Sequence, residues 1–180
     1  MNISKDLGYV HVYTGDGSGV REVGLGLALR AVGYGLNVVV IQFLWGTTES
    51  GEYRIQNRLK PHFKVYPFGR AELVDPAQST PTDEYLAQEA MEYARRLVAR
   101  PHERPDLLIL DHANPAVHYG LVESKDMLDF MENIPANMEL VLTGTPAHDE
   151  VLSRAHIVTD LQKVKHLEDR GVGSRRGIDH

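Results

Sequence analysis

The chain has 180 residues, of which 42% are hydrophobic, and it carries a formal net charge of −6. This length allows one sizeable hydrophobic core and is short for two equal domains, so we expect a single domain over residues 1–180. The acidic balance argues against general binding of nucleic acid, because neutralising phosphates requires clustered Lys and Arg. The sequence contains no cysteine, which excludes disulfides, thiolate zinc sites and a cysteine nucleophile.

The sequence also bears on location in the cell. Its first residues lack the apolar stretch of a secretory signal, and no apolar run reaches the about 18 residues of a membrane-spanning helix. We therefore expect a cytosolic protein that does not engage membranes. The one basic cluster, residues 170–176, is interleaved with glycines; it is either an anion-binding tail or a solvated one, and the solvated tail is favoured.

The first part of the chain predicts a strand, a glycine loop, a helix and a second strand. Residues 9–14 are β-rich and end in the glycine-rich residues 15–19, after which apolar residues recur at helical spacing over 23–32. Two glycines then stop the helix, and residues 37–44 form a near-continuous apolar run. Such a run is typical of a strand buried on both faces of a parallel sheet.

The rest of the chain continues this alternation. A short helix is predicted around residues 53–59, and a longer one begins at Thr80 and Pro81, with Asp83 at the capping-box spacing. Further helices are predicted after Ser124 and from Thr145–Pro146. The remaining predicted strands are residues 63–68, 106–111, 138–143 and 157–161, and residues 165–180 are predicted to be an irregular tail.

Alternating strands and helices predict an α/β fold with a doubly wound, mostly parallel sheet of about six strands. In such folds ligands bind at the carboxyl ends of the strands, where the glycine loop and Asp111 fall. A glycine loop between a first strand and a first helix presents backbone N–H groups to an anion, which favours a phosphate site. By itself the loop is a moderate signal, and a tight turn that uses glycine for its positive φ is the less favoured alternative.

Several blocks in chain order strengthen the phosphate-site hypothesis. They are residues 12–19, 24–31, 40–44, 108–111 with Asn114, 119–121, 139–144, and 164–166 with Asp169, Gly171, Arg175 and 177–179. Together they resemble the ATP:corrinoid adenosyltransferase family. The resemblance implies a P-loop NTPase-like fold, commonly a homodimer, with ATP and Mg²⁺ as cofactors and a corrinoid as substrate or ligand. It also implies transfer of the adenosyl group of ATP to cob(I)alamin, with release of triphosphate.

The glycine loop departs from the family pattern. The candidate phosphate or nucleotide site consists of Gly15, Asp16, Gly17, Ser18, Gly19, Val20, Arg21 and Glu22. Where the family has lysine, threonine and threonine after the last glycine, this chain has Val20, Arg21 and Glu22. Either Arg21 reaches the phosphates and Glu22 binds Mg²⁺, or Val20 packs on the sheet and the other two lie in solvent; the second interpretation is favoured.

An acidic pair in the family corresponds here to Asp111 and His112, which are candidate Mg²⁺ or nucleotide residues. His112 and His118 lack a third ligand, so we predict no directly bound metal. The residues aligned with the corrinoid-facing segments are Gln42, Trp45, Arg70, Glu72 and Val74. Trp45 either stacks on a flat ligand or covers core, and core is favoured. The matching tail residues are Lys165, His166, Asp169 and Arg175.

These departures lead to two hypotheses of different class. The first is a divergent corrinoid adenosyltransferase in which the loss of lysine and hydroxyls argues against catalysis. The second is a non-catalytic nucleotide- or corrinoid-binding protein of the same fold that acts through a partner. An NTP hydrolase is disfavoured, since it requires the same lysine and magnesium ligands.

Overall fold

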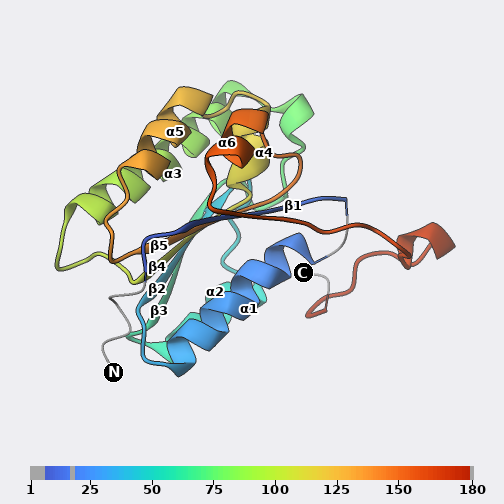
Figure 1. Ribbon diagram of the computed structural model, residues 1–180. Helices are drawn as coiled ribbons and strands as arrows, with labels where there is room; N and C mark the ends of the chain where they lie inside the picture. The colour runs from blue at the N-terminus through green and yellow to red at the C-terminus, as the bar shows by residue number, and fades with distance from the viewer. Residues whose placement is uncertain (1–6, 17–18, 179–180) are drawn as a thin grey trace.

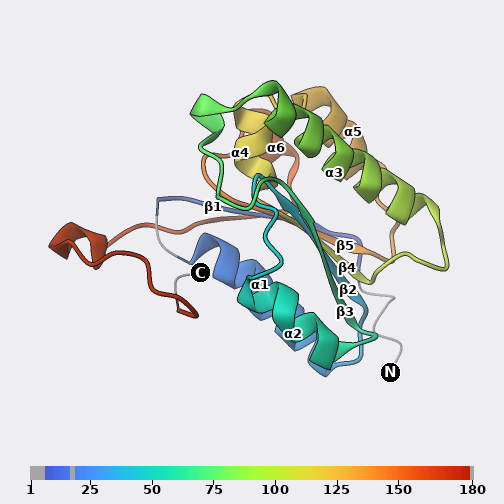
Figure 2. The same ribbon diagram turned by 180° about the vertical axis from the view of Figure 1, so that it is seen from behind.

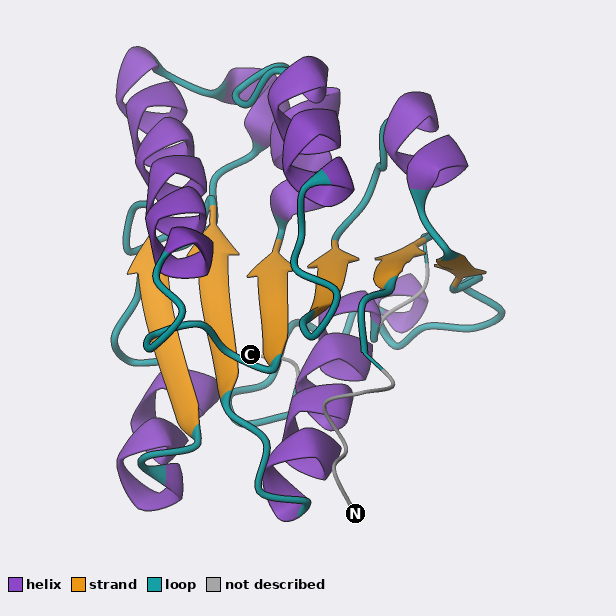
Figure 3. Ribbon diagram, turned by 60° about the vertical axis from the view of Figure 1, so that its left-hand side comes forward, coloured by secondary structure: helices purple, strands orange, loops and turns teal. Residues whose placement is uncertain are grey.

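A six-stranded sheet forms the centre of the computed structural model, which describes residues 7–16 and 19–178. Its strands are β1 (Val10–Thr14), β2 (Val38–Phe43), β3 (Phe63–Phe68), β4 (Leu107–Asp111), β5 (Glu139–Thr143) and β6 (Ile157–Asp160). They lie in the order β3-β2-β4-β5-β1-β6, and every neighbouring pair is parallel. All carboxyl ends therefore meet at one edge of the sheet (Figure 3).

Helices cover both faces of this sheet (Figures 1 and 2). On one face lie α1 (Val20–Gly33) and α2 (Gly51–Leu59); on the other lie α3 (Pro81–Ala99), α4 (Ala113–His118), α5 (Ser124–Glu132) and α6 (Asp149–Arg154). Two single turns, η2 (Pro76–Gln78) and η3 (Glu168–Arg170), complete the described elements. The predicted fold class, a single α/β domain like those of P-loop NTPases, is thereby confirmed. Within the described part of the chain, no helix is long and apolar enough to cross a membrane.

The two faces of the sheet build two hydrophobic cores. Along β2, Val40 packs with the α1 side and Ile41 with the α3 side, and both are fully buried. Along β4, Ile109 and Leu110 divide in the same way. Burying each such side chain contributes about 1.5–3 kcal/mol, which explains the continuous apolar runs in the central strands.

The structure corrects the prediction of a helix that starts at Thr145–Pro146. The helix α6 begins at Asp149, where Nδ1 of His148 accepts the backbone N–H of Glu150 at 3.3 Å. Thr145 instead donates its hydroxyl to the carbonyl of Gly15, which ties it to the glycine loop. The sequence did not predict α4 either, because that helix has only six residues and includes a proline.

The chain leaves the sheet after β6 and runs outward before it turns back towards the first turn of α1 (Figure 1). All four residues of β6 are exposed, and Ile157 and Val158 keep 43% and 47% of their surface accessible. The tail that follows has one turn of helix, η3, and is otherwise irregular among residues 161–178. The tail thus closes one side of the edge where the glycine loop lies.

Asp83 anchors the long loop before α3. Its carboxylate accepts the backbone N–H and hydroxyl of Thr80 at 2.8 and 2.7 Å, and Nε and Nη2 of Arg70 at 2.7 and 3.1 Å. The Asp83 side chain is only 1% exposed. Burial tends to raise the pKa of Asp83, but these hydrogen bonds outweigh it and lower the pKa. Asp83, which completes the capping box of α3, therefore also positions the loop before that helix.

We expect Asp83→Asn to lower the free energy of unfolding at pH 7 by about 1–3 kcal/mol, because it removes a buried charge that accepts four hydrogen bonds. Urea denaturation measures this. Asp126→Asn is the matched control: its carboxylate pairs with Arg95 but is 48% exposed, so a change within about 0.5 kcal/mol is expected. A lowered pKa gives stability that is lost as pH falls through it, so the gap between wild type and Asp83→Asn should shrink below about pH 4. Equal effects of the two substitutions would contradict the claim that Asp83 anchors the loop before α3.

Candidate functional site

The glycine loop lies at the carboxyl end of β1 and leads into α1. Gly15 and Gly19 have φ of 112° and 101°, a region that favours glycine. A side chain on Gly15 would collide with the carbonyl of Leu161, so the loop and the start of the tail are in close contact. Asp16 adds to this contact by accepting the backbone N–H of Lys163 at 2.9 Å. Gly17 and Ser18, also predicted to bind phosphate, fall outside the described residues.

A cleft of about 910 Å³ opens between this loop and the tail. The first turn of α1 borders it, so that the positive end of the helix dipole faces the cleft. Charged groups of both signs line it: Asp16, Arg21, Glu22, Lys165, Glu168 and Arg175. His112 and His166 line it as well. The cleft thus lies beside the N-terminus of a helix, where an anion site is expected, but its lining carries both positive and negative charges.

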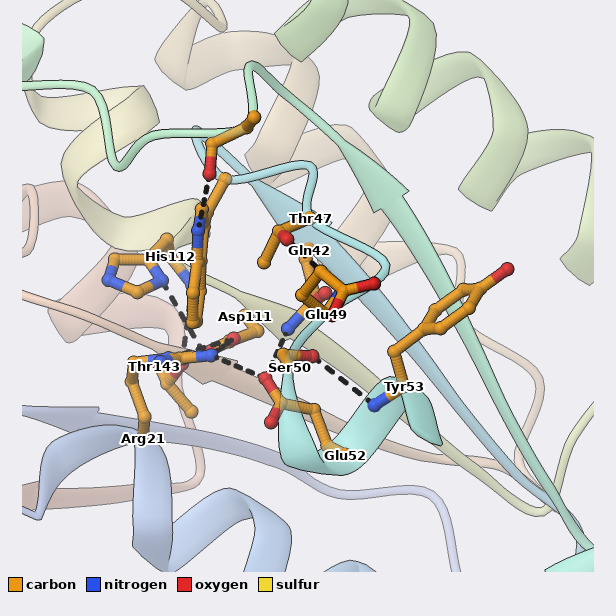
Figure 4. A network of polar contacts seen from close by, with 12 residues as sticks. Arg21, Gln42, Thr47, Glu49, Ser50, Glu52, Tyr53, Asp111, His112 and Thr143 are labelled. Atoms are coloured by element: carbon orange, nitrogen blue, oxygen red, sulfur yellow. Dashed lines mark hydrogen bonds and ion pairs between the residues drawn. The ribbon is translucent and has the colours of Figure 1, made fainter. Parts of the chain in front are cut away.

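Arg21 points across the carboxyl edge of the sheet, and the expectation that it lies in solvent is wrong. Its side chain is only 17% exposed. Nε and Nη2 each donate to Oδ2 of Asp111 at 3.0 Å, and Nη2 also donates to Oε1 of Glu52 at 2.9 Å (Figure 4). Burial tends to lower the pKa of Arg21, but Asp111 and Glu52 outweigh it and raise the pKa. Arg21 is therefore fixed by two carboxylates at the border of the cleft, while Val20 beside it is buried and Glu22 is exposed.

Asp111 ends β4 and is almost fully buried, with a side chain 3% exposed. Its Oδ2 accepts from Arg21, and its Oδ1 accepts the hydroxyl of Thr143 at 2.7 Å. Burial tends to raise the pKa of Asp111, but the charge of Arg21 and the hydrogen bonds that it donates outweigh burial and hold this pKa far below its usual range. Asp111 thus remains ionised and is already paired.

Glu52 and Thr143 belong to this site but were missed by the sequence analysis. Glu52 lies in the first turn of α2, and its Oε1 accepts from both Arg21 and Nε2 of Gln42, the latter at 2.8 Å. Gln42 is itself buried at the end of β2. Thr143 ends β5 within the family-like block 139–144, which could have indicated it, whereas Glu52 in α2 had no such signal. Gln42 accordingly supports Glu52 and does not face the cleft described above.

Trp45 lies under Arg21, so the expectation that it covers the core is wrong. The guanidinium carbon of Arg21 is 4.5 Å from the centre of the indole ring, which is a cation–π distance. The indole N–H donates to the carbonyl of Ala71 at 3.2 Å. Trp45 also borders a second cavity of about 500 Å³, with Thr47, Glu49, Ser50, Ala71 and Arg176. The Arg21–Trp45 pair therefore touches both cavities.

Three residues of the loop after β3 are predicted to face a corrinoid, namely Arg70, Glu72 and Val74. In the structure they lie in three different surroundings. Val74 is buried in the core on the α3 side, with 4% of its surface exposed, so its predicted ligand-facing position is wrong. Val74 is held there because its N–H donates to the carbonyl of Leu44 at 3.0 Å. Arg70 pairs with Asp83, and Glu72 is exposed.

His112 connects β4 to α4 with a left-handed φ of 59°. Its buried Nδ1 has no hydrogen-bond partner and lies 3.7 Å from Oδ1 of Asp111, too far for a hydrogen bond. Asn114 fixes the same corner by donating to the carbonyls of Tyr13 and Gly144, both at 3.0 Å. In the described ranges, no cluster of three His, Asp or Glu side chains has the arrangement of a metal site.

The tail residues divide into two groups. Lys165, His166 and Arg175 border the cleft. Asp169 instead holds the tail in shape, since it accepts Nζ of Lys163 at 3.1 Å and the backbone N–H of His166 at 3.3 Å. The tail therefore places cationic groups opposite the N-terminus of α1.

The residues present do not fit the Mg²⁺ ion that the family resemblance implies. Mg²⁺ is held by carboxylate oxygens, waters and the phosphates of its nucleotide. Here Asp111 and Glu52 accept from a guanidinium instead, and the hydroxyl that follows the loop in the family is absent. We therefore derive no step through a magnesium ion.

Comparison with known proteins agrees with this architecture. The family model described as ATP:corrinoid adenosyltransferase BtuR/CobO/CobP matches residues 6–180. The corrinoid adenosyltransferase CobA of Salmonella typhimurium is 30% identical over 176 residues, covering 98% of this chain and 87% of the relative. The corrinoid adenosyltransferase of Escherichia coli (strain K12) is 31% identical, with 96% and 86% covered, and that of Pseudomonas aeruginosa is 28% identical, with 96% and 83% covered. The chain belongs to the ATP:corrinoid adenosyltransferase family.

Proposed function

We propose that this chain is a divergent member of the family that binds a nucleotide and a corrinoid but does not transfer the adenosyl group at the rate of its relatives. The observation that carries the proposal is that Arg21 forms ion pairs with Asp111 and Glu52. The family resemblance implies a hydroxyl and a magnesium ion in this region instead. We propose that the protein acts in the cytosol, in corrinoid handling.

Nucleotide binding is supported by the cleft beside α1. The helix end offers backbone N–H groups, and Lys165 and Arg175 border the opposite side. Loss of the loop lysine removes a charge-assisted hydrogen bond worth roughly 1.5–3 kcal/mol. This weakens a phosphate complex by about one to two orders of magnitude. Glu22, exposed on the first turn, adds a like charge near the anion.

Corrinoid binding is supported by the second cavity. Trp45 offers a flat apolar ring there, and its orientation is fixed by Arg21 on one side and the carbonyl of Ala71 on the other. Arg176, from the tail, borders the same cavity. Since the tail lines both cavities, it is the natural link between the two ligands.

We expect the purified chain, supplied with cob(I)alamin and Mg-ATP, to form adenosylcobalamin at least about 100-fold more slowly than the Escherichia coli relative. The reason is the combined loss of the lysine and of the magnesium ligands. The absorbance change of the corrinoid measures the rate, and the relative run in parallel controls for the reduction of cobalt. A rate within about tenfold of the relative would contradict the proposal.

We expect a corrinoid to bind without ATP, with Trp45→Ala weakening it by about tenfold because the stacking surface is lost. Isothermal titration calorimetry with a cobalamin gives the affinity directly. Tyr34→Ala is the control, since Tyr34 is an aromatic residue 73% exposed just beyond the C-terminal end of α1. No heat of binding up to about 1 mM cobalamin, or equal losses in both variants, would overturn corrinoid binding at this cavity.

We also propose a homodimer, as the family resemblance implies. The exposed apolar side chains of the edge strand β6, Ile157 and Val158, support an interface there. Light scattering should give twice the chain mass of 20.1 kDa, and Val158→Lys should shift the mass towards the monomer. A wild-type mass of one chain would contradict this.

A further inference from the structure

Two largely buried carboxylates meet at the carboxyl edge of the sheet. The side chains of Asp111 and Glu52 are 3% and 12% exposed, and they come from β4 and α2. Water reaches neither group freely, so the pair of negative charges requires a cation to remain ionised. In a protein that uses a metal, such a pair is a natural place for a divalent cation.

Arg21 supplies that cation from within the chain. One nitrogen, Nη2, joins the two carboxylates, at 3.0 Å from Asp111 and 2.9 Å from Glu52 (Figure 4). Nε adds a second contact to Asp111 at 3.0 Å, and Trp45 covers the face of the guanidinium at 4.5 Å. Arginine is not deprotonated in proteins, so its charge is permanent.

We propose that the Arg21 guanidinium takes the place of a divalent cation at this edge, so that the cleft binds its anion without any metal. Only the identity of the anion, the polyphosphate of a nucleotide, rests on the function proposed above. The third nitrogen of Arg21, Nη1, takes no part in the contacts to Asp111 and Glu52, which leaves a donor on a residue that borders the cleft.

Neighbouring side chains of the chain also bind oxygens of the two carboxylates. Oδ1 of Asp111 accepts the hydroxyl of Thr143 at 2.7 Å, and Oε1 of Glu52 accepts the amide of Gln42 at 2.8 Å. A further titratable group beside the pair is His112, whose Nδ1 is 3.7 Å from Oδ1 of Asp111. Groups of the chain itself thus bind both oxygens of Asp111 and Oε1 of Glu52.

Binding of Mn²⁺ in the absence of nucleotide tests this directly, with free Mn²⁺ followed by electron paramagnetic resonance. The wild type should leave the free-ion signal unchanged up to about 1 mM, whereas Arg21→Thr should bind one Mn²⁺ at least about tenfold more tightly. Arg95→Thr is the matched control, because Arg95 also joins two carboxylates, Glu92 and Asp126, but at the surface. It should behave like the wild type.

Two results would overturn the proposal: tight binding of Mn²⁺ by the wild type, or no gain in Arg21→Thr. If Arg21→Thr unfolds without metal, circular dichroism during Mn²⁺ addition decides instead, since recovery of the helical signal supports the proposal and its absence overturns it.

A second measurement uses the wild type alone. The dissociation constant of ATP should change less than about threefold when Mg²⁺ is replaced by EDTA, and a loss of more than tenfold would overturn metal independence. If ATP does not bind under either condition, nucleotide binding in the proposed function fails, while the Mn²⁺ titration still decides the role of Arg21.

Discussion

The ion pair between Arg21 and Asp111 is the interaction on which the site depends. It joins the first turn of α1 to the end of β4, and through Glu52 it also reaches α2. Because Asp111 is nearly inaccessible to water, its charge is tolerated only while the guanidinium stays in place. Trp45 packs against the same guanidinium. Because Arg21 borders the first cavity and Trp45 the second, one charged group helps to shape both.

Much of the fold could be predicted from the sequence because the central strands are buried on both faces. The apolar run at 37–44 becomes β2, all of whose residues are buried, and the run at 106–111 becomes β4. The turn residues of the glycine loop likewise marked the entry to α1. Local signals failed where the partner is distant: α4 starts at Ala113, and its corner is fixed by Asn114, which binds a carbonyl 101 residues away.

The site was harder to predict, for the same reason. The sequence placed Arg21 on the first turn of α1, and nothing nearby in the chain indicated that its partner is Asp111, 90 residues later. Glu52 lies just before the short helix predicted around residues 53–59, and nothing in the sequence connected it to Arg21 or Gln42. Arg21, His112 and Trp45, which no local pattern in the sequence connects, fall within one neighbourhood of the structure.

The buried pair also constrains how this sequence can change. Removing one partner of a buried ion pair costs about 3–5 kcal/mol, a large part of the total stability of an ordinary domain. Replacement of Arg21 by threonine is therefore not a neutral step, since Asp111 would be left unpaired until a metal ion bound in place of the guanidinium. The requirement for stability alone therefore favours Arg21 at this position, whichever ligand the cleft binds.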